Sequence, residues 1–214
     1  MADHTARILC YGDSLTWGHD PANDGLRHAI SDLWPSVLAE AIPEATVLAD
    51  GVNGRSTSFD DHAAPCDRNA TRTLPVALAA HMPLDLVIIM LGTNDLKPKH
   101  GAVASGAQAG MRRLIQLVRG FPFKPASAQP QILIVAPPYC NAPAKGAPDS
   151  PARVGESHLF APLYAELAEE EGVAFFDAGR VAQPSPLDGV HLDAANTRAI
   201  GAALVEPVRA LLEL

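Results

Sequence analysis

Residues 7–18 read RILCYGDSLTWG, an apolar run that ends abruptly in Gly12, Asp13 and Ser14. Strands that are buried on both faces of a parallel sheet read as short continuous apolar runs of this kind. Ligand sites in such sheets form just beyond the carboxyl ends of the strands. We therefore expect a first strand that delivers Ser14 to the edge of a sheet, where ligands bind.

A histidine and a carboxylate lie close together near the other end of the sequence. Residues 187–193 read LDGVHLD, so that Asp188 precedes His191 by three residues and one turn can hold both side chains. A serine hydroxyl is a weak nucleophile unless a base removes its proton. Asp188 could accept from one ring nitrogen of His191 and leave the other nitrogen to face Ser14. The pattern predicts a catalytic triad of Ser14, His191 and Asp188.

Two further stretches supply hydrogen-bond donors at the same sheet edge. Residues 84–95 read LDLVIIMLGTND, a second buried-strand run whose terminal turn carries the side-chain amide of Asn94. Residues 49–57 read ADGVNGRST and offer Gly51 and Gly54, whose backbone N–H groups can approach a ligand closely.

These four stretches, in this order, resemble the SGNH (GDSL-type) hydrolases, and the resemblance covers nearly the whole chain. It implies that Ser14 is the nucleophile and first oxyanion donor, that Asp188 and His191 complete the triad, and that Gly54 and Asn94 are the other oxyanion donors. We prefer Gly54 to Gly51 for this role. The motifs GDSLTWG and LGTND look most like those of small bacterial arylesterases and acyltransferases.

The residues around the serine differ from the elbow of the α/β-hydrolases, which reads Gly-x-Ser-x-Gly, because Thr16 occupies the second glycine position. Asp13 and Trp17 flank the serine turn and are assigned to substrate binding. For Trp17, a structural aromatic that packs under the following loop is an equally good interpretation.

Strand and helix patterns alternate along the chain. Apolar runs predict strands at the start of residues 7–18 and at 45–49, 84–91, 132–136 and 173–177, and helical spacing predicts helices over 31–42, 73–81, 102–119, 157–171 and 194–214. The alternation indicates an α/β fold with a five-stranded parallel sheet between two helical layers, in one domain spanning residues 1–214. The family resemblance adds a flavodoxin-like strand order.

Composition excludes several classes of partner. The formal net charge of −8 argues against nucleic acid and against an anionic membrane surface. No apolar stretch has membrane-spanning length, and residues 1–5 lack the basic and apolar regions of a signal peptide, so we expect a cytoplasmic protein. Cys10, Cys66 and Cys140 are too few and too widely spaced for a disulfide framework.

Residues 59–69 gather side chains of the types that bind metals, namely Asp60, Asp61, His62, Cys66 and Asp67. Their spacing matches no zinc or calcium pattern, and a solvated loop is the preferred interpretation. We expect neither a metal nor a cofactor. The polar residues 18–25 and the proline-rich residues 139–154 are expected to be loops that shape the mouth of the site.

These observations lead us to expect a serine esterase that hydrolyses short acyl and aryl esters through an acyl-enzyme, with acyl transfer to alcohols as a further activity. Aromatic residues make up only 5% of the chain, and the loops near Ser14 offer no long apolar channel for a fatty acyl group. The alternatives are a deacetylase of acetylated carbohydrate and a flavodoxin-like domain that binds a ligand without catalysis. We also expect a homo-oligomer.

Overall fold

The computed structural model describes residues 5–23, 25–125, 129–145 and 151–214. Its centre is a five-stranded parallel sheet in the order β2-β1-β3-β4-β5, the flavodoxin-like order expected from the resemblance. The strands are β1 (Ala6–Gly12), β2 (Ala45–Gly51), β3 (Leu86–Met90), β4 (Gln131–Ala136) and β5 (Ala174–Asp177).

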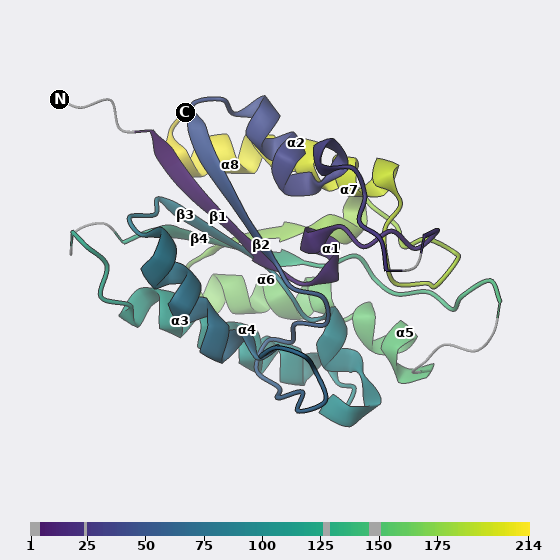
Figure 1. The fold of residues 1–214 in the computed structure, drawn as a ribbon. Helices are drawn as coiled ribbons and strands as arrows, with labels where there is room; N and C mark the ends of the chain where they lie inside the picture. Colours follow the sequence, from purple (N-terminus) through teal and green to yellow (C-terminus); the bar gives the residue numbers. More distant parts are fainter. Residues whose placement is uncertain (1–4, 24, 126–128, 146–150) are drawn as a thin grey trace.

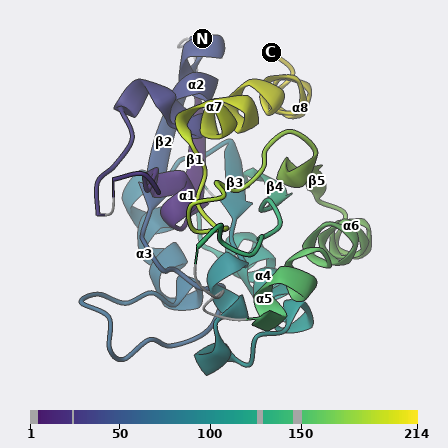
Figure 2. The ribbon, with the colours of Figure 1, turned by 90° about the vertical axis from the view of Figure 1, so that its right-hand side faces the viewer.

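Helices cover both faces of this sheet and form a three-layer sandwich (Figures 1 and 2). On one side lie α2 (Trp34–Ala41), α7 (Ala194–Ala203) and α8 (Val205–Leu212), and on the other lie α3 (Ala70–His81), α4 (Ala104–Gly120) and α6 (Phe160–Glu171). The short helices α1 (Ser14–Trp17) and α5 (Pro151–Ser157) lie at the end of the sheet where the strands terminate. The 3-10 turns are η1 (Ile30–Asp32), η2 (Thr93–Leu96), η3 (Pro98–His100) and η4 (Ala178–Arg180).

The two faces of the sheet carry separate hydrophobic cores because side chains alternate along each strand. In β1, Leu9 and Tyr11 point into the core under α3, α4 and α6, whereas Ile8 and Cys10 point into the core under α2, α7 and α8. The helical stripe predicted for residues 102–119 is confirmed, since Met111, Leu114, Ile115 and Val118 are all buried on α4.

Prolines account for most differences between the predicted and observed helix bounds. Pro162 cannot donate to the carbonyl of residue 158, so α6 begins at Phe160 rather than at residue 157. Pro207 likewise has no N–H for the carbonyl of Ala203, where the predicted C-terminal helix divides into α7 and α8. Pro35 leaves the carbonyl of Ser31 without a donor, and the predicted helix over 31–42 becomes η1 followed by α2.

Two other bounds depend on residues outside the apolar pattern. The helix predicted from residue 73 starts at Ala70, because the side chain of Asn69 accepts from the backbone N–H of Thr71 and caps α3. The irregular loop predicted over 139–154 instead ends in α5, which starts at Pro151; residues 146–150 of that prediction lie outside the described residues. Across the described ranges, no helix combines the length and the apolar character that crossing a lipid bilayer requires.

Candidate active site

Ser14 stands at the start of α1, directly after β1. The carboxylate of Asp13 caps α1 by accepting from the backbone N–H of Leu15 at 2.9 Å. The chain turns sharply here because Gly12 has no side chain: a Cβ on Gly12 would come within 2.9 Å of the carbonyl oxygen of Met90. The turn leaves Ser14 7% exposed at the carboxyl edge of the sheet.

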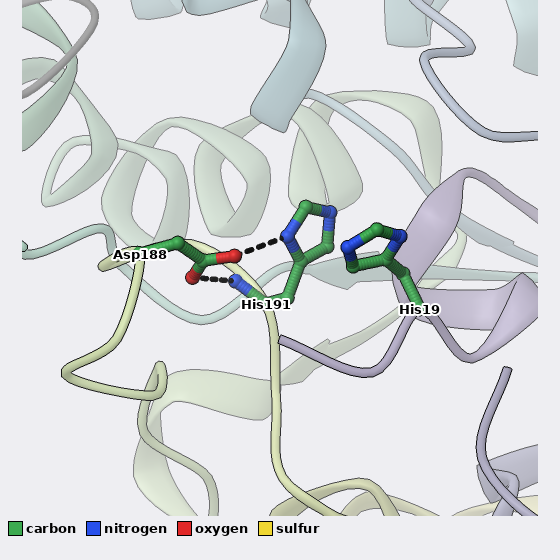
Figure 3. Close-up of side chains that lie close together, drawn as sticks. All are labelled: His19, Asp188 and His191. Carbon is green, nitrogen blue, oxygen red and sulfur yellow. Dashed lines mark hydrogen bonds and ion pairs between the residues drawn. The ribbon is translucent and has the colours of Figure 1, made fainter. Parts of the chain in front are cut away.

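His191 and Asp188 meet Ser14 from the loop that follows η4. Nε2 of His191 lies 3.0 Å from Oγ of Ser14. On its other side, Nδ1 of His191 lies 2.6 Å from Oδ2 of Asp188, as Figure 3 shows. The other carboxylate oxygen of Asp188 accepts from the backbone N–H groups of Val190 and His191, each at 2.9 Å. Burial alone would raise the pKa of Asp188, but these hydrogen bonds outweigh it and hold the pKa at about 2. Asp188 is therefore an anion that orients His191.

The loop that carries this pair is fixed by backbone hydrogen bonds. The N–H of Ser185 donates to the carbonyl of His191 at 2.7 Å, and the N–H of Gly189 donates to the carbonyl of Ser185 at 2.8 Å. Gly189 has a φ of 74°, and a Cβ there would lie 2.0 Å from the carbonyl oxygen of Asn141. The proline-rich segment thus packs directly against the loop and supports it.

Asn94 reaches the serine from η2, the turn after β3. Its Nδ2 donates to Oδ2 of Asp13 at 3.0 Å and to the carbonyl oxygen of Arg55 at 3.1 Å. These two acceptors fix which edge of the amide carries the N–H groups, and they hold it beside Ser14.

Gly54 lies in the turn after β2, with a φ of 82° that favours glycine. Among the hydrogen bonds of the described residues, none uses the backbone N–H of Gly54 or of Ser14. Gly54 lines the cavity in front of Ser14, whereas Gly51 does not and packs against the backbone of Trp17. The geometry thus brings together the three oxyanion donors expected from the resemblance.

Arg55, which the sequence interpretation missed, holds this turn in place. Its buried guanidinium donates to the carbonyl oxygens of Gly12 and Asp50, both at 2.8 Å, and lies 4.0 Å from the centre of the Tyr11 ring. No local sequence signal separates this arginine from an exposed one in a polar turn.

Asp13 and Trp17, both assigned to substrate binding from the sequence, are not among the described residues that line the cavity. Asp13 is 1% exposed, and burial raises the pKa of its carboxyl group. Trp17 contacts the guanidinium of Arg27 at 5.4 Å from its ring centroid, and its carbonyl accepts from the same side chain. Asp13 therefore caps α1 and orients Asn94, and Trp17 packs beneath its own loop.

The cavity in front of Ser14 has a volume of about 600 Å³. Both loops expected at its mouth contribute to it: His19 and Gly25 come from residues 18–25, and Pro143, Lys145 and Arg153 come from residues 139–154. Asn53, Arg68, Thr93 and Lys97 also line it and were missed, because each is an ordinary polar residue of a loop.

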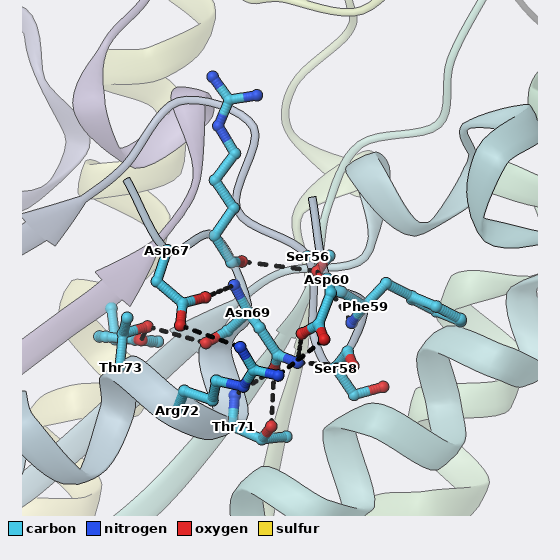
Figure 4. Close-up of polar contacts among 11 residues, drawn as sticks. Ser56, Ser58, Phe59, Asp60, Asp67, Asn69, Thr71, Arg72 and Thr73 are labelled. Carbon is cyan, nitrogen blue, oxygen red and sulfur yellow. Dashed lines mark hydrogen bonds and ion pairs between the residues drawn. The ribbon is translucent and has the colours of Figure 1, made fainter. Parts of the chain in front are cut away.

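The ligand-rich segment at residues 59–69 is a network of hydrogen bonds and ion pairs (Figure 4). Nδ2 of Asn69 donates to Oδ1 of Asp60 at 2.7 Å, and Arg72 pairs with the other oxygen of Asp60 at the same distance. Asp61 pairs with both Arg68 and Lys99. These carboxylates therefore stabilise the conformation of residues 59–69 and of the start of α3.

Within the described residues, the one group of three side chains spaced to hold a metal ion is His19, Asp188 and His191. Two of these already form the hydrogen-bonded pair behind Ser14, and the ring of His19 lies against that of His191, tilted by 35° with centroids 4.0 Å apart (Figure 3). These contacts fit a histidine held in place for proton transfer.

The hydroxyl, imidazole and carboxylate in hydrogen-bonded sequence define a serine hydrolase. The chain matches the model of the GDSL-like lipase/acylhydrolase family over residues 10–199 and belongs to that family. A search of curated proteins gave no significant match.

Several solved structures are similar over almost their whole length. A protein from Agrobacterium tumefaciens str. C58, provisionally described as an arylesterase, is 56% identical, with 96% of this chain and 99% of that chain covered and a TM-score of 0.93. A carbohydrate acetylesterase family member from Sinorhizobium meliloti is 49% identical, with 98% of this chain and 100% of that chain covered and a TM-score of 0.95. The aryl esterase of M. smegmatis is 37% identical, with 96% of this chain and 99% of that chain covered and a TM-score of 0.87.

Proposed function

We propose that this esterase hydrolyses short acyl and aryl esters through an acyl-enzyme on Ser14. The observation that carries the proposal is the continuous chain of contacts from Asp188 through His191 to Ser14 at the wall of an open cavity. A binding domain without catalysis has no use for this arrangement.

The geometry supports the following sequence of steps. Nε2 of His191 removes the proton of Ser14 as Oγ attacks the ester carbonyl carbon, and Asp188 stabilises the imidazolium that forms. The N–H groups of Ser14 and Gly54 and the amide of Asn94 hold the oxyanion. Because both Nδ2 hydrogens of Asn94 already have acceptors, the oxyanion shares one of them. His191 then protonates the leaving alcohol, and water hydrolyses the acyl-enzyme with the same histidine as base.

The lining of the cavity supports short acyl groups. Its apolar side chains are few, chiefly Pro143, Leu187 and Val190, and the rest of the wall is polar or charged. Each methylene of a longer chain gains about 0.8 kcal/mol only where it is buried against apolar surface. The efficiency kcat/KM for nitrophenyl esters should therefore stop rising at about four to six carbons, and a continued rise to octanoate would contradict a short acyl pocket.

Covalent labelling tests the nucleophile directly. A fluorophosphonate probe should add its mass to the peptide that contains Ser14, and Ser14→Ala should abolish both labelling and hydrolysis while the circular dichroism spectrum is unchanged. Labelling of a different residue, or hydrolysis by the variant near the rate of the native enzyme, would overturn the proposal.

A second candidate activity is removal of acetyl groups from carbohydrate. It is supported by the polar lining of the cavity and by the similarity to the Sinorhizobium meliloti protein. Acetylated xylose and nitrophenyl acetate, compared at equal enzyme concentration, decide between the two substrates. Acyl transfer is a further proposal, supported by the motif resemblance, and its test is ester formation when an alcohol is added.

We also propose a homo-oligomer in the cytoplasm. Leu26 and Ile30 are 61% and 70% exposed, which favours contact with another subunit, and Cys10 and Cys66 are free thiols, which fits a reducing compartment. A monomer in light scattering at micromolar concentration would reject the oligomer. Recovery of the protein outside the cytoplasmic fraction of its own cells would reject the location.

A further inference from the structure

The cavity in front of Ser14 has a charge opposite to that of the whole protein. The chain has 16 lysines and arginines against 24 aspartates and glutamates. Four of those cations line the cavity, Arg68, Lys97, Lys145 and Arg153, whereas Asp188 is the one carboxylate among the described lining residues. A cluster of like charges costs free energy unless a ligand of opposite charge binds there.

Of the four cations that line the cavity, Lys97 is the nearest in sequence to an oxyanion donor, three residues after Asn94. Its side chain is half-buried. Burial lowers its pKa, and Lys99, Arg153 and Arg68 lower the pKa further. No acceptor for its Nζ is present among the described residues. In the described part of the chain, the ammonium group is therefore held near the site with no hydrogen bond or ion pair.

Arg68 brings a second cation next to the oxyanion donor. A Cβ on Gly54 would lie 2.8 Å from Cζ of Arg68, so the guanidinium contacts the backbone of Gly54. One edge of this guanidinium pairs with Asp61 at 3.0 Å, but its buried Nε has no partner.

Two uncharged groups of the same wall also lack partners. Thr93 is 4% exposed and its buried Oγ1 has no hydrogen bond, and Oδ1 of Asn53 is in the same situation. Buried polar atoms are normally hydrogen-bonded, so unpaired ones on residues that line a cavity point to a polar ligand. Donors from Thr93 and Arg68 together with the charge of Lys97 match the chemistry of a carboxylate or phosphate.

We propose that the natural substrate is an anionic ester, with a carboxylate or phosphate that binds to Arg68, Lys97 and Thr93 beside the oxyanion donors. The inference rests on the proposed esterase activity and narrows its substrate class. The anion can belong to the acyl part or to the alcohol part of the ester, and the experiment separates these two cases.

The test compares charged and neutral esters of matched shape at low ionic strength. One arm uses 4-acetoxybenzoate and 4-acetoxybenzamide, which differ in the charge of the alcohol part. The other arm uses monophenyl glutarate and phenyl pentanoate, which differ in the charge of the acyl part. The ratio of kcat/KM for the charged ester to that for the neutral ester is measured in native enzyme, Lys97→Gln and Lys99→Gln.

We expect Lys97→Gln to lower this ratio about 10- to 100-fold in one arm, because a charge-assisted contact is lost. Lys99→Gln is the matched control: it removes the same charge two residues away, from a side chain that pairs with Asp61 and does not line the cavity, and the ratio should stay within about twofold of the native value. Added salt should lower the native ratio in the same arm.

Other outcomes overturn the inference. If Lys97→Gln reduces both members of each pair equally, the cations stabilise the oxyanion of any ester and select no anionic substrate. If the ratio does not change in either arm, the cations have no part in substrate choice. Failure of the native enzyme to hydrolyse any of the four esters would instead reject the proposed function itself.

Discussion

Two segments at the carboxyl edge of the sheet have opposite effects on the ionisation of the side chains that they carry. In residues 185–191, hydrogen bonds lower the pKa of Asp188 and favour its charged form. In residues 92–97, burial raises the pKa of Asp95 to about 7 and lowers that of Lys97, so both charged forms are disfavoured. Asp188 therefore has its partners before substrate arrives, and the buried Asp95 has Thr57, whereas Lys97 faces the cavity where we propose that an anionic ligand binds.

The largest effect should come from Asp188→Asn, which removes the carboxylate that orients His191 in residues 185–191. The backbone N–H groups of Val190 and His191 would keep the amide oxygen of the asparagine, so its NH2 group would face Nδ1 of His191 and donate to it. The ring then takes the wrong tautomer for proton transfer. We expect kcat to fall about 10³- to 10⁴-fold, measured with nitrophenyl acetate. Asp95→Asn, the same change in the other segment, is the matched control and should retain most activity. A loss of less than tenfold in Asp188→Asn would contradict the role of Asp188.

Asn94→Ala tests the residue of the second segment that is expected to donate to the oxyanion. Removal of one oxyanion donor should lower kcat about 10²- to 10³-fold with little change in KM. The substitution also leaves the carboxylate of Asp13 without its Asn94 donor, so the melting temperature is measured in parallel. A rise in KM with kcat unchanged would place Asn94 in substrate binding instead.

The pH dependence of stability should separate the two segments. The unfolded pKa of Asp95 is near its ordinary value of 3.8, so between about pH 4 and pH 7 unfolding releases a proton that the native state keeps. Native stability then decreases as pH rises through this window, by up to a few kcal/mol. Asp188 has the opposite sign, since its contribution is present above about pH 4 and is lost as pH falls toward 2.

Asp95→Asn should reduce the decrease in stability between pH 4 and pH 7, as measured by urea unfolding at each pH; Asp13, whose pKa burial also raises, contributes to what remains. Asp193→Asn serves as a comparison because the pKa of Asp193 is lowered, so its loss should leave this decrease intact. Equal slopes for the native protein and Asp95→Asn would show that Asp95 is ionised throughout.

The smallest expected effect is that of Thr93→Val. Since Oγ1 of Thr93 is buried without a partner, its removal should leave the free energy of unfolding unchanged or raise it by up to about 1 kcal/mol. Thr57→Val is the contrast, because Oγ1 of Thr57 donates to buried Asp95 and its loss should cost about 1–3 kcal/mol. A comparable loss in both variants would mean that Thr93 has a partner in solution.

The strands and the reacting groups follow from local sequence patterns, and the binding wall does not. The apolar runs before Gly12 and Gly92 predict buried strands, and parallel strands must end at one edge, which brings Ser14 and Asn94 together. Arg68, Lys97 and Arg153 come from three separate segments, and a charged loop residue looks the same in sequence whether it faces solvent or a cavity. The breaks at Pro162 and Pro207 have a local cause, yet the apolar spacing continues across them.

The contact between Ser14 and His191 joins residues 177 positions apart, whereas Asp188 and His191 are three apart. Asp188 and His191 can form their contact as soon as their own loop forms. The contact between Ser14 and His191 requires the complete sheet between them. The loss of chain entropy on closing so long a segment is offset only by the free energy of the packed core. Ester hydrolysis therefore reports on the whole native structure. The rate at which activity returns after dilution from denaturant would measure the last step of refolding. Comparison with the rate at which helix content returns would show how long after helix formation the site assembles.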